Sequence, residues 1–417
     1  MGLTRTKRRI LVIVESLPLG SDQRLKKQVQ SLLEAGYHVS VICRRSTEND
    51  PYRGLPGLHL VEHPSPPHLS GKVGFLVEYS ASWLMAAVLT VVVFCRFGFD
   101  AIQVCCPPDI YFPLAIPFKL LGRRFVVDQR DLSPEVFADR YGRTEGLFLT
   151  ILRKLERISY RSADHVICVN DSLKRVILDR GDKDKTEVSV VGNGPVLASL
   201  PTVVDPPRQE NGRLVCCWLG VMGPQDHVDF VLWMAQDLVH RRGRRDCHFL
   251  LVGAGESLSS LRELSSDLGL DDWVTFTGWL DENEVNGHVA EAAIGIDTNL
   301  QEEVTPVKGM LYMAFRLPMV AFDLRETRSM AGEAALYAVP GDTGDLADRV
   351  VALLDDPDRR RRMGAIGRQR VERYLSWELQ REPYLAVFER LLGRNTDGSG
   401  IPKVMESRGQ LLDENRL

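Results

Sequence analysis

The chain has 417 residues, of which 44% are hydrophobic and 26% charged, and its formal net charge is -4 at pH 7. This length exceeds what one hydrophobic core usually serves, so it predicts a globular protein with two domains. The slightly negative charge argues against a nucleic-acid partner, because proteins that bind nucleic acid normally carry a basic footprint.

The cysteines indicate the cellular compartment of the protein. Eight cysteines are scattered without a CxxC pair, mostly in or beside apolar runs. There a free thiol acts as a small hydrophobic side chain, so a reduced, cytoplasmic protein is favoured over a disulfide scaffold or a metal site.

Residues 83–95 form an almost wholly apolar run, shorter than the ~20 residues that span a bilayer. We expect a buried helix there, with peripheral membrane contact as the alternative.

The first half of the chain alternates apolar runs with helical patterns. Residues 10–14 form a continuous apolar run, typical of a strand buried on both faces of a parallel sheet. A loop with Gly20 follows, and then a helix with one apolar face that ends at Gly36. The same criteria predict a helix over 148–160 and strands at 39–43, 101–104, 125–127, 165–169 and 188–191.

A polar, proline-containing stretch over residues 201–212 has the composition of a linker. After it the alternation restarts, with a helix expected over 228–239 and strands at 214–219, 249–252, 274–277, 294–296 and 319–321. Alternating strands and helices predict the α/β class, with a doubly wound parallel sheet in each half. The polar end, residues 395–417, is expected to be a disordered tail.

Two such domains place the carboxyl ends of two parallel sheets opposite each other, where ligands bind. Gly20 lies between the first strand and a helix, a place where backbone amides hold phosphate or carboxylate; a turn glycine without a ligand is the alternative. Gly253 and Gly255, followed by Glu256, would let a base or a ribose approach the backbone closely.

The strongest local unit lies within residues 302–314. Thr305 and Pro306 suit the N-cap and first position of a helix. This helix would direct free amides and Lys308 into the cleft, and a diphosphate is the ligand best matched to amides plus an ammonium. A capped helix with a solvated lysine is the alternative interpretation.

This unit, together with residues 318–328 and 334–337, resembles the nucleotide-sugar site of the family 4 retaining glycosyltransferases. Residues 106–109, 128–135, 193–195 and 220–226 match in the same order, so the resemblance covers roughly residues 10–390. It implies the GT-B fold, with two doubly wound Rossmann-like domains facing across a cleft. The first (1–200) would hold the acceptor and the second (213–375) the donor, with a C-terminal helix (376–394) returning to the first domain.

The resemblance also implies roles for individual residues. No metal is expected, because protein cations and helix dipoles would neutralise the leaving diphosphate. No cofactor is expected either, because the nucleoside diphosphate sugar is itself a substrate. The acceptor would be a small molecule or a glycan, held by Asp22, Asp109 and Asp131. Gln129, Arg130 and Glu303 would take part in catalysis. The donor would be bound by Gly20, Gly220, Met222, Gly253, Gly255, Glu256, Thr305, Pro306, Val307, Lys308 and Leu311.

The chain departs from the family pattern at three places. Leu311 stands where the second carboxylate of a Glu-x7-Glu pair normally grips the ribose hydroxyls. Val221 and Asp226 occupy positions that usually supply an arginine and a lysine to the diphosphate. Gln129 and Arg130 replace a stretch where relatives carry histidines, and Arg130 could supply the missing positive charge. Neither is a general base at neutral pH.

Two hypotheses follow from these departures. In the first, the chain is a retaining glycosyltransferase with an altered donor or an unusual acceptor in specialised metabolism. A thiol acceptor would need less help from a base than an alcohol, because its pKa is ~8.5. The usual alternative is O-glycosylation of a cell-surface or antibiotic precursor. In the second, the chain is a catalytically degenerate GT-B module that binds a nucleotide-sugar or partners an active subunit.

Overall fold

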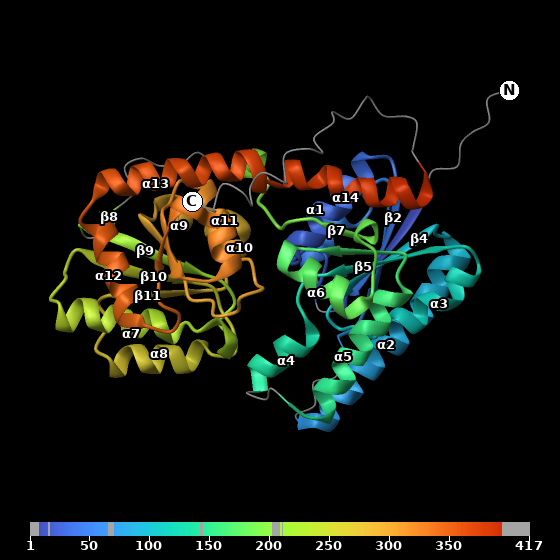
Figure 1. Ribbon diagram of the computed structural model, residues 1–417, viewed down its shortest axis with the longest axis horizontal. Coiled ribbons are helices and arrows are strands. Elements are labelled where there is room, and N and C mark those ends of the chain that lie inside the picture. The colour runs from blue at the N-terminus through green and yellow to red at the C-terminus, as the bar shows by residue number, and fades with distance from the viewer. Residues whose placement is uncertain are drawn as a thin grey trace.

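Two lobes, each built on a parallel sheet with helices on both faces, make up the molecule (Figure 1). The computed structural model describes residues 8–393 except 16, 66–70, 142–144, 202–208 and 211. The predicted tail, 395–417, and most of the predicted linker, 201–212, lie outside the described residues. The predicted fold class, two doubly wound α/β domains, is confirmed.

The sheet of the first domain has the strand order β3-β2-β1-β4-β5-β6-β7, and every adjacent pair is parallel. The central strands are almost completely buried, which explains their continuous apolar runs. β3 was not predicted, because polar residues interrupt its apolar pattern. The strands are β1 (Arg9–Ile13), β2 (His38–Arg44), β3 (Leu58–His63), β4 (Ala101–Cys106), β5 (Arg124–Gln129), β6 (His165–Cys168) and β7 (Val188–Val190).

The second sheet repeats this topology with the parallel order β11-β10-β9-β12-β13-β14, and β8 (Gln209–Glu210) pairs antiparallel with β9. In both sheets the strand order reverses beside the first strand of the domain. That switch point is where doubly wound folds bind ligands. The strands are β9 (Arg213–Leu219), β10 (Cys247–Val252), β11 (Val274–Gly278), β12 (Ile294–Asp297), β13 (Met319–Phe322) and β14 (Ala335–Ala338).

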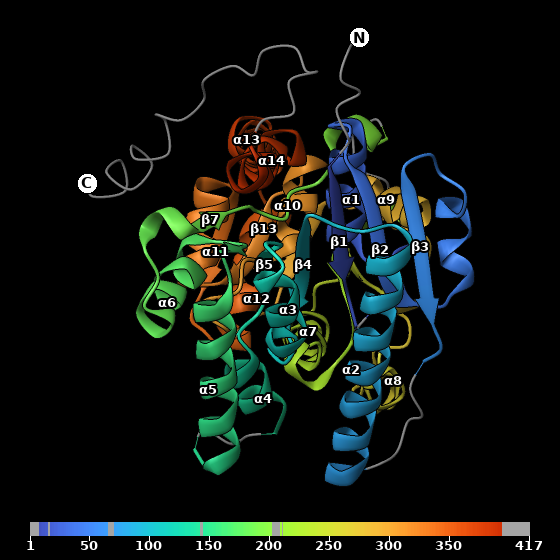
Figure 2. The same cartoon turned by 90° about the vertical axis from the view of Figure 1, so that its right-hand side faces the viewer.

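Helices cover both faces of the first sheet. α1 and the C-terminal α14 pack on one face, and α2, α3, α5 and α6 on the other (Figure 2). α14 returns from the second domain, and its Trp377 donates from Nε1 to Ser31 Oγ at 3.0 Å. The helices are α1 (Gln23–Glu34), α2 (Gly71–Arg96), α3 (Phe112–Leu120), α4 (Ser133–Tyr141), α5 (Leu147–Ser162), α6 (Asp171–Gly181) and α14 (Trp377–Leu392).

The second sheet is covered in the same way. Each face of this sheet has its own hydrophobic core, which includes the apolar sides of the helices that cover that face. On one face lie α9 (Glu282–Glu291), α10 (Val307–Ala314) and α11 (Arg325–Ala331), and on the other α7 (Asp229–Gln236), α8 (Leu258–Asp267) and α12 (Thr343–Leu354); α13 (Pro357–Arg370) precedes α14.

The apolar run at residues 83–95 lies in α2, but the expectation that this helix is buried is wrong. Leu84, Val88 and Val91 are 60%, 55% and 54% exposed, although Ala86 and Val93 face the core. An all-apolar sequence carries no polar face that would mark its outer side, so burial could not be assigned from composition. None of the described helices is long and apolar enough to cross a bilayer.

Candidate active site

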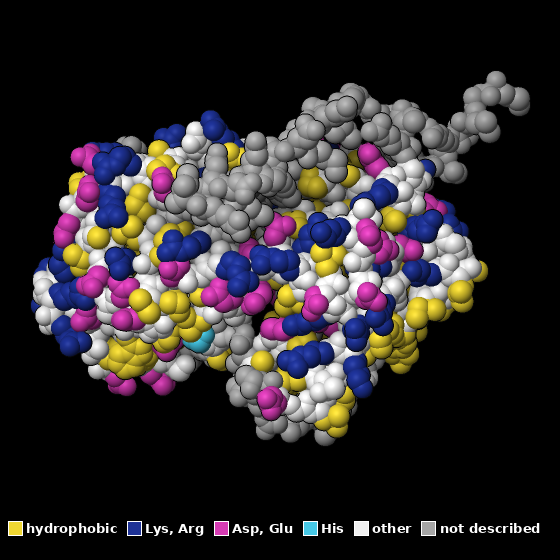
Figure 3. Space-filling model, in the orientation of Figure 1, with side chains coloured by type: hydrophobic (Ala, Val, Ile, Leu, Met, Phe, Trp, Pro, Cys, Tyr) yellow, Lys and Arg dark blue, Asp and Glu magenta, His cyan; other side chains and the backbone are white. Residues whose placement is uncertain are grey.

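The cleft between the domains is lined by loops at the carboxyl ends of both sheets. The loops after β1 and β5 line one side of the cleft, and the loops after β9, β10 and β12 line the other. The volume of the cleft is about 2910 Å³. The same hollow is visible between the lobes in the space-filling view (Figure 3). Both topological switch points therefore open into one space, as expected for two facing doubly wound domains.

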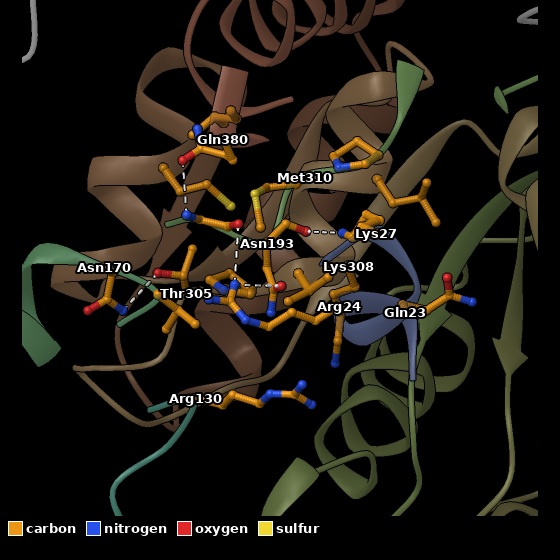
Figure 4. Close-up of a pocket in the computed structure, with 18 of the residues that line it drawn as sticks. Gln23, Arg24, Lys27, Arg130, Asn170, Asn193, Thr305, Lys308, Met310 and Gln380 are labelled. Carbon is orange, nitrogen blue, oxygen red and sulfur yellow. Dashed lines mark hydrogen bonds between the residues drawn. The ribbon is translucent and has the colours of Figure 1, made fainter. Parts of the chain in front are cut away.

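The start of α10 differs by one residue from the prediction. Pro306, not Thr305, is the N-cap, and no side chain caps this helix end. Thr305 instead accepts a 3.0 Å hydrogen bond at Oγ1 from Asn170 of the first domain (Figure 4). Because the first amides of a helix have no intrahelical partner, those at Val307 and Lys308 remain available to a ligand. All five of these residues line the cleft.

Lys308 is held at the base of this end of the cleft. Its Nζ lies 4.1 Å from the centroid of the Trp218 ring and 3.5 Å from Asp297 Oδ1. Trp218 is fully buried, and its Nε1 donates to Thr298 Oγ1 at 3.1 Å. A Cβ added at Gly220 would stand 3.4 Å from the same Nζ. The ammonium is thus positioned by the protein alone, beside Gly220, which has no side chain.

The glycines of the second domain have a packing role that was not predicted. A Cβ at Gly253 would lie 1.9 Å from the Gly220 carbonyl oxygen, and one at Gly255 would lie 2.4 Å from the Met222 carbonyl oxygen. The loops after β9 and β10 therefore meet backbone to backbone. Gly220 and Gly253 line the cleft. Met222 is completely buried, and Gly255 and Glu256 are exposed outside the cleft lining.

The positions that depart from the family pattern differ in their surroundings. Leu311 is partly exposed in the cleft wall, one turn after Lys308 on α10. Val221 is 58% exposed in the same wall. Asp226 also lines the cleft, and its Oδ2 accepts from the Gly223 amide at 3.1 Å. An aspartate here stabilises its own loop, and it places a negative charge where a cation was expected.

Arg130 lies across the cleft, just after β5, and is already paired. Its guanidinium contacts Asp22 Oδ2 at 2.5 Å and Asp128 Oδ2 at 3.4 Å. Asp128 is fully buried and also holds Arg24 at 2.8 Å. The two arginines and two aspartates balance, so Arg130 brings hydrogen-bond donors to the cleft but little net positive charge. Asp22 in addition accepts from the Leu25 amide, which caps α1.

The other predicted residues of the first domain are placed differently. Gly20 and Asp131 line the cleft. Gln129 is buried, and its Nε2 donates to the Asp131 carbonyl at 2.7 Å. Asp109 is buried too, where it accepts from the Ser133 hydroxyl, and burial raises its pKa to about 6. Neither Gln129 nor Asp109 is among the residues that line the cleft.

Two bridges join the domains across the cleft. At one side Asn170 Nδ2 donates to the Glu303 carbonyl at 2.6 Å as well as to Thr305, and Ser172 donates to Glu326 at 2.5 Å. Glu303 thus contributes its backbone to this bridge, and its side chain does not line the cleft. At the other side Lys26 Nζ lies 2.8 Å from Glu282. These bridging contacts were not predicted, since the paired residues are separated by more than 130 positions in the chain.

Two further basic residues in the cleft were missed. Lys27 donates to the carbonyls of Asn193 and Gly194 at 3.1 and 2.7 Å, and burial lowers its pKa to about 7. Arg325 opens α11 and lines the cleft, and its guanidinium forms no ion pair with any described residue. The rule that drew attention to Lys308, a cation at a helix start after a strand, would also have found Arg325.

The fold and the cleft define a two-domain enzyme of the GT-B class. Two family models match: "Glycosyl transferase 4-like domain" over residues 20–194 and "Glycosyl transferases group 1" over residues 213–356. The chain belongs to the family 4 glycosyltransferases, which are retaining, metal-independent GT-B enzymes.

Individual relatives agree with this assignment. Alpha-D-kanosaminyltransferase of Streptomyces kanamyceticus is 30% identical over 36% of this chain and 39% of that enzyme, so this chain matches about two fifths of that relative's length. The 2-deoxystreptamine glucosyltransferase of the same organism is 23% identical over 79% of this chain and 85% of its own. Sucrose-phosphate synthase from Thermosynechococcus elongatus superposes with a TM-score of 0.73, at 16% identity, over 93% of this chain and 99% of its own. This last likeness shows the fold.

Proposed function

We propose that the protein transfers a sugar from a nucleoside diphosphate, held by the second domain, to a small-molecule or glycan acceptor, held by the first. The placement of Lys308 carries this proposal. Lys308 and the residues that carry the free amides at the start of α10 line the same cleft, and an ammonium together with such amides suits a diphosphate. Arg325, which forms no ion pair with any described residue, is a further cation in the same lining.

The chemistry needs charge stabilisation more than a base. In a retaining transfer the bond between the anomeric carbon and the diphosphate breaks, and a bond to the acceptor atom forms on the same face of the sugar. The acceptor proton passes to the departing phosphate, while Lys308 and the amides stabilise the charge that develops there. No histidine is among the described residues that line the cleft. This composition suits a reaction in which the leaving group takes the proton.

A small-molecule acceptor from specialised metabolism is supported by the two Streptomyces relatives, whose names describe transfer of kanosamine and transfer of glucose to 2-deoxystreptamine. Within that class the missing histidines leave two alternatives for the acceptor atom, a thiol sulfur and the more usual hydroxyl oxygen. The thiol alternative follows from the lower pKa of thiols, ~8.5, and a matched pair of acceptors that differ in oxygen and sulfur would test it.

A catalytically degenerate binding module is the second candidate. It is favoured by Leu311, which offers no acceptor to ribose hydroxyls, and by the pairing of Arg130 with Asp22. We favour the enzyme over a module that only partners another subunit, because such a partner has no use for a lysine fixed in the cleft.

Thermal unfolding with UDP, GDP, dTDP and ADP tests donor binding. We expect one nucleotide to raise the unfolding temperature more than the others, and stabilisation by none of them would contradict the donor site. Hydrolysis or transfer from sugar conjugates of the preferred nucleotide then separates the two candidates. Binding without turnover for any acceptor would support the degenerate module.

A further inference from the structure

The outer face of the first domain, formed by α2, α3 and α5, is distinct from the cleft. These helices lie side by side on one face of the sheet (Figure 2), and Phe94 of α2 and Phe118 of α3 have ring centroids 5.1 Å apart. None of their described residues lines the cleft. Whatever contacts this face does so without entering the candidate active site.

Apolar side chains project to solvent from two of these helices. On α2 the exposed residues Leu84, Val88 and Val91 are spaced four and three positions apart, so they share one side of the helix. At the end of α3, Leu120 is 85% exposed and Leu121, which follows it, 61%. Soluble monomers rarely expose so many large apolar residues on neighbouring elements unless the surface has a partner.

α5 adds charge of one sign to this face. All exposed charged side chains within α5 are basic, namely Arg153, Lys154, Arg157 and Arg161, and its one acidic residue, Glu156, is buried. Arg161 pairs with Asp182. The other three form no ion pair with the part of the chain that the structure describes. Exposed apolar residues of α5, Leu147, Ile151 and Ile158, lie on the same helix.

The chemistry of this face indicates the partner. Unpaired basic side chains bind anionic surfaces, and exposed leucine, valine and isoleucine side chains are stabilised by transfer from water to an apolar medium. An anionic lipid bilayer offers both, with phosphates above acyl chains. A protein interface is less well matched, because such interfaces are centred on tyrosine and tryptophan. Among the side chains of these helices that the structure describes, Phe148 is the sole aromatic of the large exposed apolar residues.

We propose that the face formed by α2, α3 and α5 docks on the surface of an anionic lipid bilayer. The aliphatic residues of α2 and α3 enter the headgroup and acyl boundary, and Arg153, Lys154 and Arg157 contact lipid phosphates. The helices lie on the membrane rather than cross it, and the cleft stays open to water-soluble substrates. This inference does not depend on the identity of the donor or the acceptor.

Flotation of the full chain with vesicles tests the proposal. We expect binding to phosphatidylglycerol vesicles at least tenfold tighter than to phosphatidylcholine vesicles, weakened by added salt. Replacing Arg153, Lys154 and Arg157 with glutamine should reduce binding to phosphatidylglycerol roughly 100-fold. The matched control replaces Arg241, Arg361 and Arg362, which are 79%, 66% and 67% exposed on the second domain, and should leave binding within twofold.

A second variant, Leu84→Ser with Val88→Ser, should lower the binding that persists at high salt. Circular dichroism and the nucleotide-induced thermal shift show whether each variant is folded with its donor site intact, so failure of this proposal is distinguishable from failure of the proposed function. No binding of the wild-type chain to either vesicle would overturn the proposal. So would equal losses in the two triple variants, or a dimer in sedimentation that the serine variant dissociates.

Discussion

The ammonium of Lys308 lies 4.1 Å from the centroid of the Trp218 ring, and this contact ties the candidate donor site to the core of the second domain. The face of an indole attracts a cation, and it does so most strongly where water is excluded. Trp218 cannot move away, because it is completely buried at the end of β9 and its Nε1 is bonded to Thr298. The lysine is therefore oriented before any ligand arrives.

Lys308→Ala should weaken nucleoside diphosphate binding roughly 10- to 100-fold, since a hydrogen bond to a charged group contributes about 1.5–3 kcal/mol. Isothermal titration calorimetry with the preferred nucleotide measures this. Lys174→Ala is the matched control, because Lys174 also lines the cleft but belongs to the first domain. We expect it to change the affinity by less than twofold. Unchanged affinity in Lys308→Ala would show that the diphosphate binds elsewhere.

Leu311→Glu should strengthen binding of a ribonucleoside diphosphate about tenfold. The position lies in the cleft wall on the same helix as Lys308, where a carboxylate can accept hydrogen bonds from both ribose hydroxyls. The gain should be smaller for the 2′-deoxynucleotide, which lacks one of these hydroxyls, and smaller for Leu311→Gln, which has no charge. Titration calorimetry on both variants provides the comparison. Weaker ribonucleotide binding in Leu311→Glu would place the ribose away from α10.

Asn170→Asp should loosen the closed arrangement of the domains while keeping α6 intact. Asn170 Oδ1 caps α6 by accepting from the Leu173 amide at 2.8 Å, and its Nδ2 bonds to Glu303 and Thr305 across the cleft. Aspartate retains the cap but loses the two donors, each worth about 1 kcal/mol. Small-angle X-ray scattering should show a larger radius of gyration and a shift back towards the wild-type value with nucleotide.

Glu282→Gln is the control for the Asn170→Asp variant, because it weakens the bridge to Lys26 on the opposite side of the cleft. The Glu282 side chain is 51% exposed, and exposed pairs contribute about 0–1 kcal/mol. We expect little change in scattering. An equal change in both variants would mean that the bridge through Asn170 has no special role in closure.

The sequence predicted the two sheets because strands buried on both faces carry continuous apolar runs, as in β1 and β9. The prediction that α2 is buried was wrong for a related reason: an apolar pattern does not distinguish a buried helix from one with an exposed apolar side. The placement of Lys308 in the cleft followed from the helix start, a local signal. The pairing of Arg130 with Asp22, 108 positions away, depends on how β5 and α1 meet in space, and no local pattern contains it.

Asp109→Asn should stabilise the protein at neutral pH but not in acid. Burial raises the pKa of Asp109 from 3.8 to about 6, so the folded state holds a proton that the unfolded state releases between these values. The contribution of this proton to the free energy of unfolding is fully present below pH 4 and is lost as the pH rises through 6. The wild type is therefore penalised at pH 7.5 by as much as about 3 kcal/mol, at 1.36 kcal/mol for each pKa unit.

Urea denaturation from pH 4 to pH 8 measures this difference. Asparagine keeps an acceptor for the Ser133 hydroxyl, so the variant should match the wild type near pH 4 and exceed it above pH 6. Asp182→Asn, at a position whose side chain is 79% exposed, is the control and should show no such divergence. Parallel curves for wild type and Asp109→Asn across this range would contradict the raised pKa, and the buried carboxyl would then be ionised and stabilised by its neighbours.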